Sequence, residues 1–597
     1  MRTRVADYLT SKLYEAGGQH VFLITGGMIM HLTDALLRHG KQKYVCCHHE
    51  QAAVMAADTY GRLTNRLGVA YVTAGPGALN AMTGVVGAYV DTAPCIIVSG
   101  QSKVSQAVVT GPRQFALQGF NTLSLYKQVT KYAVMLQDIP RVRYEVEKCI
   151  WMATSPRVGP VWLECPIDIQ GAMFDPEEHE PFIPPAGAGT DWPDVEAKMG
   201  SVVDAIKSSR RPCILAGAGV RLSSAIDELL RFAEKASIPV LTSRLGMDLV
   251  GDDHPLFAGR PGTYGDRPAN FAVQNCDLLL TIGCRLGIGL VGYDFQDFAR
   301  HAVKIMVDVD PQELAKPSVL PDIPVLSDAG LFLKQCGVRL GGYQLNNPAW
   351  LEQIRTWRQR YPVDLPEYAD EREGINSYHF TRLLSERMPQ DAVIVCDTGS
   401  CFHVHAQAFK VQTGQRHIIT GGLSTMGYMP GVIGAAAGMG AHEVYCITGD
   451  GSLQMNIQEL QTLVHNNYRA KLIVHSNNGY LLIRHTQKNF QDGRYIGTHS
   501  ETGVSFPDLK KLSKAYGIHY LRISTLSECD AKIAELLDYQ DGPVICEVMS
   551  PAEQLLIPRV ASKKRDDGSM MSMPYDDMYP FLSREEYAAN CVREKIL

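Results

Sequence analysis

Short apolar runs alternate with longer amphipathic stretches along most of the chain. The runs 21–24, 212–216 and 444–448 are apolar at nearly every position, which is typical of strands buried on both faces of a parallel sheet. The stretches between such runs, for example 453–465, repeat their apolar residues at helical spacing. This alternation predicts an α/β protein built from doubly wound parallel sheets.

Two connectors rich in proline and glycine divide this pattern into three blocks. The first runs from Gly171 to Pro193, and the second runs from Gly341 to about residue 375; both are typical of linkers. The first and third blocks show the same alternation, which predicts two similar units. We predict three domains and a polar tail, with boundaries at 1–172, 194–340, 376–560 and 561–597.

The composition is that of an ordinary globular protein. Of 597 residues, 45% are hydrophobic and 20% are charged, and the net charge is −6 without a long basic run. Neither nucleic acid nor an anionic membrane is therefore an expected partner. The apolar runs are too short for a membrane helix, and the N-terminus lacks a signal-peptide pattern. The 15 cysteines form no Cys-x-x-Cys pair, so we expect reduced thiols and a cytoplasmic protein.

Two polar turns follow neighbouring strands in the third block. Gly449-Asp450-Gly451-Ser452 comes directly after the run 444–448, and Asn477-Asn478-Gly479 follows the run 471–474. The crossover geometry of a β-α-β unit brings both strand ends to one edge of the sheet. A carboxylate and an amide oxygen at that edge suit Mg²⁺, and the glycines let backbone N–H groups approach a diphosphate. The simpler interpretation is a turn with a satisfied Asp.

The two turns together resemble the diphosphate motif of thiamine-diphosphate (ThDP) enzymes. The resemblance implies that Asp450, Asn477 and the carbonyl group of Gly479 bind Mg²⁺. A shift of one residue would instead make Asn478 and Tyr480 the ligands, but the spacing from Asp450 favours Asn477. The further cofactor-binding residues implied by these turns are Gly449, Gly451, Ser452 and Tyr480.

A second motif opens an apolar helix in the first block. A Glu at a helix N-terminus is most simply a first-turn residue that favours the dipole. However, His49-Glu50-Gln51-Ala52-Ala53 and the stretch 55–62 resemble the acetolactate-synthase branch of the ThDP enzymes. There, a Glu hydrogen-bonds N1′ of the aminopyrimidine, so Glu50 is implied as the main catalytic residue. Protonation at N1′ lets the 4′-imino group take the thiazolium C2 proton intramolecularly.

Three further loops resemble cofactor loops of that family, although each alone could be an ordinary turn. They are 73–80, which resembles a Thr-Ser-Gly-Pro-Gly loop, 397–400, which resembles an Asp-Val-Gly turn, and 421–430, which resembles a Gly-Thr-Met-Gly loop. Met426 is implied as the residue that wedges between the two cofactor rings; its alternative is an ordinary core methionine. The other cofactor-binding residues implied by these loops are Gly75, Pro76, Asn80, Asp397, Gly399, Ser400 and Ser424.

The middle block carries weak nucleotide-loop signals at 216–219 and 283–286. Together with 262–266 and 307–310 they resemble the FAD-binding domain of acetolactate synthases. Gly287-Ile288-Gly289-Leu290 stands where that family usually has charged residues, so the sequence leaves FAD binding open.

The resemblance implies a ThDP- and Mg²⁺-dependent carboligase, which decarboxylates a 2-oxo acid, with pyruvate as the expected donor, and transfers the acyl-anion unit to a carbonyl acceptor. Acetolactate synthases carry Phe-Gln-Glu where this chain has Leu117-Gln118-Gly119, so Gln118 is retained without its neighbours. The segments 27–32, 265–274 and 480–487 resemble a branch of the family found with polysaccharide genes, which implies a keto-sugar acceptor. His31 is then a candidate pocket residue; a helix-surface histidine is the alternative.

Several alternatives stay open at this point. The chain could form acetolactate itself, act as a C–C lyase or hydrolase on a diketone, or be a cofactor-binding homologue without turnover. Family resemblance also implies a homodimer or homotetramer, with active sites at the subunit interface. Arg484 and Gln487 could contact substrate, but a solvated helix surface is the favoured interpretation.

Overall fold

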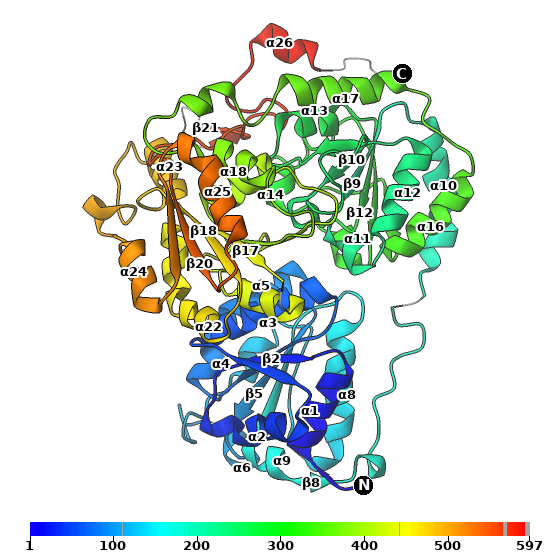
Figure 1. The fold of residues 1–597 in the computed structure, drawn as a ribbon. Coiled ribbons are helices and arrows are strands. Elements are labelled where there is room, and N and C mark those ends of the chain that lie inside the picture. Colours follow the sequence, from blue (N-terminus) through cyan, green and yellow to red (C-terminus); the bar gives the residue numbers. More distant parts are fainter. Residues whose placement is uncertain (110, 190, 441, 565–566, 568–569, 592–597) are drawn as a thin grey trace.

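The computed structural model describes residues 1–109, 111–189, 191–440, 442–564, 567 and 570–591. It contains three domains, each built on a six-stranded sheet whose neighbouring strands are all parallel. Helices cover these sheets (Figure 1). The predicted α/β class with three doubly wound sheets is therefore confirmed. In the described part of the chain, no helix is both long and apolar enough to span a membrane.

The N-terminal and C-terminal domains share one strand order. Counted in chain order within each domain, that order is 2-1-3-4-6-5. The N-terminal strands are β2 (His20–Leu23), β3 (Lys43–Cys46), β4 (Gly68–Val72), β5 (Cys95–Gln101), β6 (Tyr132–Met135) and β7 (Val161–Pro166). The C-terminal strands are β15 (Val393–Cys396), β16 (Arg416–Ile419), β17 (Val444–Gly449), β18 (Ala470–Ser476), β19 (His519–Ile523) and β20 (Val544–Met549).

The middle domain has a different order, 3-2-1-4-5-6, which is the arrangement of dinucleotide-binding folds. Its strands are β9 (Pro212–Ala216), β10 (Val240–Thr242), β11 (Phe257–Gly259), β12 (Leu278–Ile282), β13 (Val303–Asp308) and β14 (Ile323–Leu326). In such sheets, ligands bind beyond the carboxyl ends of the strands, where the order reverses. That point lies between β9 and β12 here, at the glycine-containing turns predicted from sequence.

The N- and C-terminal domains pack on each other through one pair of helices. Helix α3 (Glu50–Thr64) lies against α20 (Gly431–Met439), and the buried residues of both belong to one hydrophobic core. Small residues allow this close approach: a Cβ built on Gly434 would overlap the backbone oxygen of Ala56. Because α3 begins at Glu50, this packing fixes where that residue lies.

The helix predicted at 453–465 is interrupted. The structure has α21 (Asp450–Leu453), a 3₁₀ segment at Gln454–Glu459 and α22 (Leu460–His465), with non-helical backbone angles at Asn456. The Asn456 side chain donates a hydrogen bond to the backbone oxygen of Gly427. A contact to a distant loop thus accompanies the break, and the local apolar spacing does not reveal it.

The stretch predicted as the second connector contains a helix, α17 (Pro348–Arg360). Trp350, Ile354 and Trp357 recur at helical spacing and are buried in a core cluster of the middle domain. The Trp350 indole donates to the backbone oxygen of Pro212 (3.1 Å). This helix therefore extends the middle domain.

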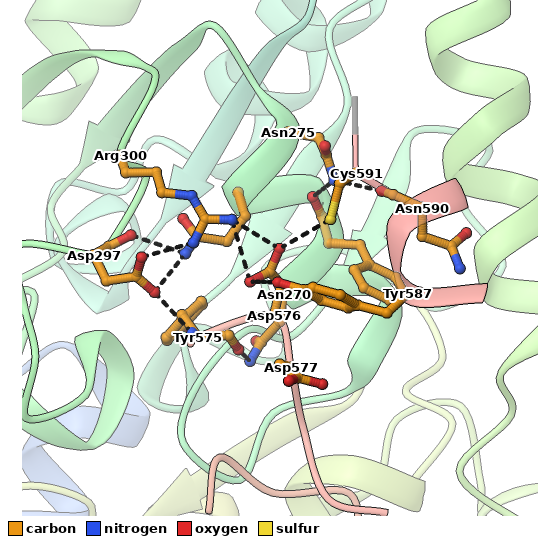
Figure 2. A network of polar contacts seen from close by, with 12 residues as sticks. Asn270, Asn275, Asp297, Arg300, Tyr575, Asp576, Asp577, Tyr587, Asn590 and Cys591 are labelled. Atoms are coloured by element: carbon orange, nitrogen blue, oxygen red, sulfur yellow. Dashed lines mark hydrogen bonds and ion pairs between the residues drawn. The ribbon is translucent and has the colours of Figure 1, made fainter. Parts of the chain in front are cut away.

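The described part of the tail also packs on the middle domain (Figure 2). Asp576 pairs with Arg300 (3.1 Å) and accepts a hydrogen bond from the Tyr587 hydroxyl (3.0 Å). Asn270, on α13 (Arg267–Asn275), donates to the backbone oxygen of Tyr575 (2.8 Å). Buried and half-buried polar contacts thus hold the tail in place.

The Gly434 contact leads to a stability prediction. We expect Gly434→Ala to lower the free energy of unfolding by about 2 kcal/mol or more, because the new methyl group overpacks the α3–α20 contact. Chemical denaturation monitored by circular dichroism measures the change. Gly200→Ala, at an exposed position of α10 (Pro193–Ser208) with open space around the new Cβ, is the matched control. It should be neutral or slightly stabilising; equal losses in both variants would contradict the packing argument.

Candidate active site

The two turns of the third block meet at one edge of the C-terminal sheet, as predicted. β17 and β18 are neighbouring parallel strands, and Gly449 pairs with His475 at their carboxyl ends. Asp450 is 6% exposed. Its carboxylate accepts hydrogen bonds from the backbone N–H groups of Gly451 (2.7 Å), Asn477 (3.2 Å) and Gly479 (3.3 Å). Asp450 therefore ties the first turn to the second.

The donor set at this edge fits a hard cation. Asn477 is buried, and its Oδ1 atom has no hydrogen-bond partner among the described residues. Burial raises the pKa of Asp450 to about 6, and no ion pair in the described chain neutralises its carboxylate. A divalent cation with oxygen ligands would satisfy both groups. The assignment of Asp450, Asn477 and Gly479 as metal ligands stays a prediction.

Arg484 stabilises the second turn through hydrogen bonds to its backbone. It lies on α23 (Leu481–Phe490), is 4% exposed, and donates to the backbone oxygens of Asn477 (3.0 Å) and Asn478 (3.1 Å). Gln487 is also buried and bonds to the backbone of Ile496. The interpretation of these two residues as a solvated helix surface was wrong, because both satisfy backbone groups of neighbouring loops.

The predicted loop 421–430 lies on the first turn. The Gly427 N–H donates to the Ser452 hydroxyl (2.8 Å), and Asn456 donates to the Gly427 carbonyl oxygen (2.6 Å). Met426 is half-buried beside these contacts, while Ser424 is exposed with a left-handed backbone. The loop is thus positioned by the same turn that contains Asp450.

Asp397 forms hydrogen bonds between its own turn and the strand that precedes Asp450. It is fully buried and accepts hydrogen bonds from the Thr398 N–H (2.7 Å) and the Thr448 hydroxyl (3.0 Å); burial raises its pKa. Gly399 and Ser400, which begin α19 (Ser400–Ala408), follow directly and are partly exposed. Asp397 therefore joins the turn 397–400 to the end of β17.

The second part of the candidate site surrounds Glu50. Helix α3 is capped by His49, whose Nδ1 accepts the Gln51 N–H, so the Glu50 carboxylate is not needed for capping. Glu50 is 8% exposed and accepts a hydrogen bond from Asn80 (3.0 Å). A Cβ built on Gly77 would lie 3.1 Å from its Oε1 atom. The structure therefore brings the predicted Glu50 and Asn80 together.

The loop that begins with Gly75 and Pro76 also contacts the predicted Gln118. A Cβ built on Gly75 would lie 2.6 Å from the backbone oxygen of Gln118, and the Gln118 side chain is exposed. The His31 side chain lies against Gly171: its Nε2 atom would be 3.0 Å from a Cβ built there. Among the described residues, no hydrogen bond joins His31 to Glu50, or Glu50 to Asp450.

Glu459 is a further residue of this region, and the sequence analysis missed it. It is fully buried, accepts the His48 N–H (2.9 Å) and the Thr462 hydroxyl (2.7 Å), and burial raises its pKa. Glu459 belongs to the C-terminal domain, and its hydrogen bond to His48 thus fixes the backbone just before Glu50. The sequence carried one signal for its burial. Glu459 is four positions before Leu463 and therefore lies on the apolar face of the helix predicted at 453–465.

A cavity of about 480 Å³, called the middle cavity here, lies at the switch point of the middle domain. The predicted nucleotide loops line it, because a Cβ built on Gly219 would lie 2.6 Å from the Cα of Gly283 and the two turns meet there. Gly421 and Gly422 of the cofactor loop also line it, and the Gly422 N–H donates to Asp91 of the N-terminal domain (2.8 Å). The cavity therefore lies where the three domains meet.

The charges of the middle cavity are mixed. Arg157 pairs with Asp310 and Glu313 (both 3.1 Å). Arg244 lies 5.1 Å from the Phe402 ring centroid and has an unpartnered, buried Nη2 atom in the described chain. Burial lowers the pKa of Arg244 to about 10. The Arg244 guanidinium and the adjoining turns at Gly219 and Gly283 fit a flat, anionic ligand such as a dinucleotide.

Three family models match the chain, one in each domain. The matched models are "Thiamine pyrophosphate enzyme, N-terminal TPP binding domain" at 3–125, "central domain" at 199–336 and "C-terminal TPP binding domain" at 397–548. An acetolactate synthase large subunit from Parasynechococcus marenigrum is 32% identical over 87% of this chain and 83% of its own length. The probable acetolactate synthase large subunit of Methanocaldococcus jannaschii is 31% identical over 92% of both chains. The large subunit of acetolactate synthase isozyme 3 from Escherichia coli is 30% identical over 89% of this chain and 92% of its own length.

The geometry around Asp450 gives a binding prediction. We expect Asp450→Asn to weaken ThDP binding in the presence of MgCl₂ at least tenfold, because the only carboxylate among the three predicted ligands is lost. Isothermal titration calorimetry measures the affinity. Asp508→Asn, at an exposed helix cap of the same domain, is the control and should bind like the unchanged protein. Unchanged ThDP affinity in Asp450→Asn would contradict the predicted metal site.

Proposed function

Because the chain belongs to the acetolactate synthase-like family of thiamine-diphosphate enzymes, we propose that it is a carboligase that uses ThDP and Mg²⁺. Pyruvate is the expected donor, and a carbonyl compound is the acceptor. The observation that carries this proposal is the buried site of Asp450 and Asn477, with its unpartnered amide oxygen, in a chain that also holds Glu50 against Asn80.

Each residue of the proposed site has a defined task. ThDP, when bound, supplies a carbon centre that accepts an acyl unit and passes it on. Asp450 and Asn477 would bind the Mg²⁺ that neutralises its diphosphate. The Glu50 carboxyl group would hold a proton at the pyrimidine N1′ atom, and Asn80 would orient that carboxyl group. Met426 would position the rings.

The proposed reaction balances in atoms and charge. The bond between the carboxylate carbon and the carbonyl carbon of the 2-oxo acid breaks, and CO₂ leaves. The former carbonyl carbon then bonds to the carbonyl carbon of the acceptor, whose oxygen takes up a proton. We propose a keto sugar as acceptor, from the resemblance of segment 27–32 to the polysaccharide branch. The alternative is acetolactate formation, which the names of the relatives favour.

We also propose that the middle cavity binds FAD. The strand order of the middle domain and the adjoining turns at Gly219 and Gly283 support this assignment, as does the Arg244 Nη2 atom, which has no hydrogen-bond partner among the described residues. Its volume of about 480 Å³ lies within the range of small-molecule sites. Because the same cavity includes Gly421 and Gly422, a bound flavin would also support the loop that carries Met426.

We further propose that the complete site forms between two chains. Glu50 and Asp450 lie in different domains, and no described hydrogen bond joins them within one chain. A homodimer would let Glu50 of one protomer and the Asp450 edge of its partner bind opposite ends of one ThDP molecule. A homotetramer would repeat this arrangement.

Product analysis tests the proposed function. Purified protein with ThDP, MgCl₂ and pyruvate should release CO₂, and mass spectrometry should show a ketose acceptor that has gained an acetyl unit. A matched sample treated with a chelator is the control. Acetolactate as the sole product would select the alternative, and unconsumed pyruvate would contradict pyruvate as donor. Visible absorption of the same sample tests the flavin: a colourless protein that does not bind added FAD would contradict that part.

A further inference from the structure

A second and larger cavity, called the tail cavity here, has a volume of about 810 Å³. Its walls come from the end of α23, the segment 555–562, the loops 263–264 and 291–297, and the tail residues 572–581. The family motifs do not include these tail residues. A small 2-oxo acid would fill only part of such a volume, which is typical of sites for considerably larger ligands.

The tail forms a fixed wall of this cavity. Arg559 and Tyr579 exchange two backbone hydrogen bonds (3.0 and 2.7 Å), and the Val560 N–H donates to Thr263 of the middle domain (2.8 Å). The network of Figure 2 holds the neighbouring residues Tyr575 and Asp576 on the middle domain. Hydrogen bonds therefore join the segment 555–562, the middle domain and the tail around this cavity.

Two side chains of the cavity have a buried nitrogen atom that lacks a hydrogen-bond partner in the described part of the chain. His485 is 7% exposed, and its Nε2 atom is buried without a hydrogen bond in the described chain. Arg559 has a buried, unpartnered Nε atom and forms no ion pair with a described residue. Burial and the nearby Arg559 lower the pKa of His485. An anion between these side chains would accept hydrogen bonds from both.

The acidic residues of the cavity do not supply that partner. Asp297 is neutralised by Arg300 (2.6 Å) and accepts the Tyr575 N–H (2.8 Å). Lys488 at the rim pairs with Glu553 (3.1 Å). Asp294 lies on the wall formed by residues 291–297, where it can accept hydrogen bonds from ligand hydroxyl groups.

The rim of the cavity is aromatic. Four of its aromatic side chains are unusually exposed for their size, with exposed fractions of 76% for Tyr293, 52% for Phe490, 46% for Phe581 and 36% for Tyr579. Exposed apolar groups gathered around one cavity are typical of a ligand site. Ring faces of this kind stack on planar or sugar rings.

Helix α23 connects the tail cavity to the candidate active site. His485 follows Arg484 in α23, and Arg484 binds the backbone of Asn477 and Asn478. One helix, α23, therefore carries a residue of the cavity and a residue that binds the predicted metal turn.

We propose that the tail cavity binds an organic phosphate that carries a ring, through Arg559 and His485 at the phosphate and the aromatic rim at the ring. The further statement that this ligand is the acceptor substrate rests on the proposed function. A sugar phosphate and a nucleotide share this chemistry, and the experiment separates them.

Calorimetric titration of the full chain, saturated with ThDP, MgCl₂ and FAD to fill other phosphate sites, tests the proposal. The probes are glucose 6-phosphate, UDP and inorganic phosphate. At least one organic probe should bind more tightly than inorganic phosphate, and Arg559→Ala should weaken it at least tenfold. Arg559→Lys should retain part of the affinity, and Tyr293→Ala, at the exposed aromatic rim, should weaken the ring-bearing probes only. Arg231→Ala, at an exposed position of α12 (Ile226–Ala236), is the control and should bind normally.

The contrary outcomes are distinct. Equal affinity of Arg559→Ala and the unchanged protein, or no organic probe binding better than inorganic phosphate, would overturn the proposal; thermal unfolding checks that each variant is folded. Tighter binding of glucose 6-phosphate selects a sugar phosphate, and tighter binding of UDP selects a nucleotide. CO₂ release from pyruvate without acceptor is measured separately. Its absence in the unchanged protein would contradict the proposed function and leave the binding result standing.

Discussion

A buried carboxylate that ties two strand ends together organises the C-terminal domain. The Asp450 carboxylate accepts hydrogen bonds from backbone N–H groups of its own turn and of the turn after β18. Among the described residues, no Lys, Arg or His side chain forms an ion pair with it. Burying a carboxylate in this way is costly unless a positive charge is added. The arrangement therefore favours a bound cation. The same two turns also bind the loop that contains Met426, through the Ser452 hydroxyl, and the Arg484 side chain, through the Asn477 backbone oxygen.

Close helix packing connects this edge to the rest of the molecule. The contact of α3 with α20 requires small residues on both helices, and it places the beginning of α3 beside Glu459 of the C-terminal domain. At the middle cavity, Asp91 and Gly422 join the N-terminal domain to the cofactor loop. The position of Glu50 and the position of the cofactor loop 421–430 thus both depend on contacts between domains.

The sequence could predict the elements whose signal is local. The run 212–216 is the observed strand β9, and the turn at Asp450 and the helix start at Glu50 lie where the motifs indicate. The break at Asn456, the burial of Arg484 and the place of Glu459 depend on partners far away in the chain. Such contacts leave no periodic pattern. The tail cavity could not be predicted either, because its walls come from five segments that are far apart in the sequence.

The most direct test of the shared site uses two variants that are each expected to be inactive, Glu50→Gln and Asp450→Asn. Each is purified alone and also co-expressed with the other at equal amounts. If each site takes Glu50 from one chain and Asp450 from its partner, half of the random dimers are mixed and hold one intact site, which restores about a quarter of the normal carboligation rate. A co-expressed sample that is no more active than either variant alone, although mixed dimers are present, would contradict the account.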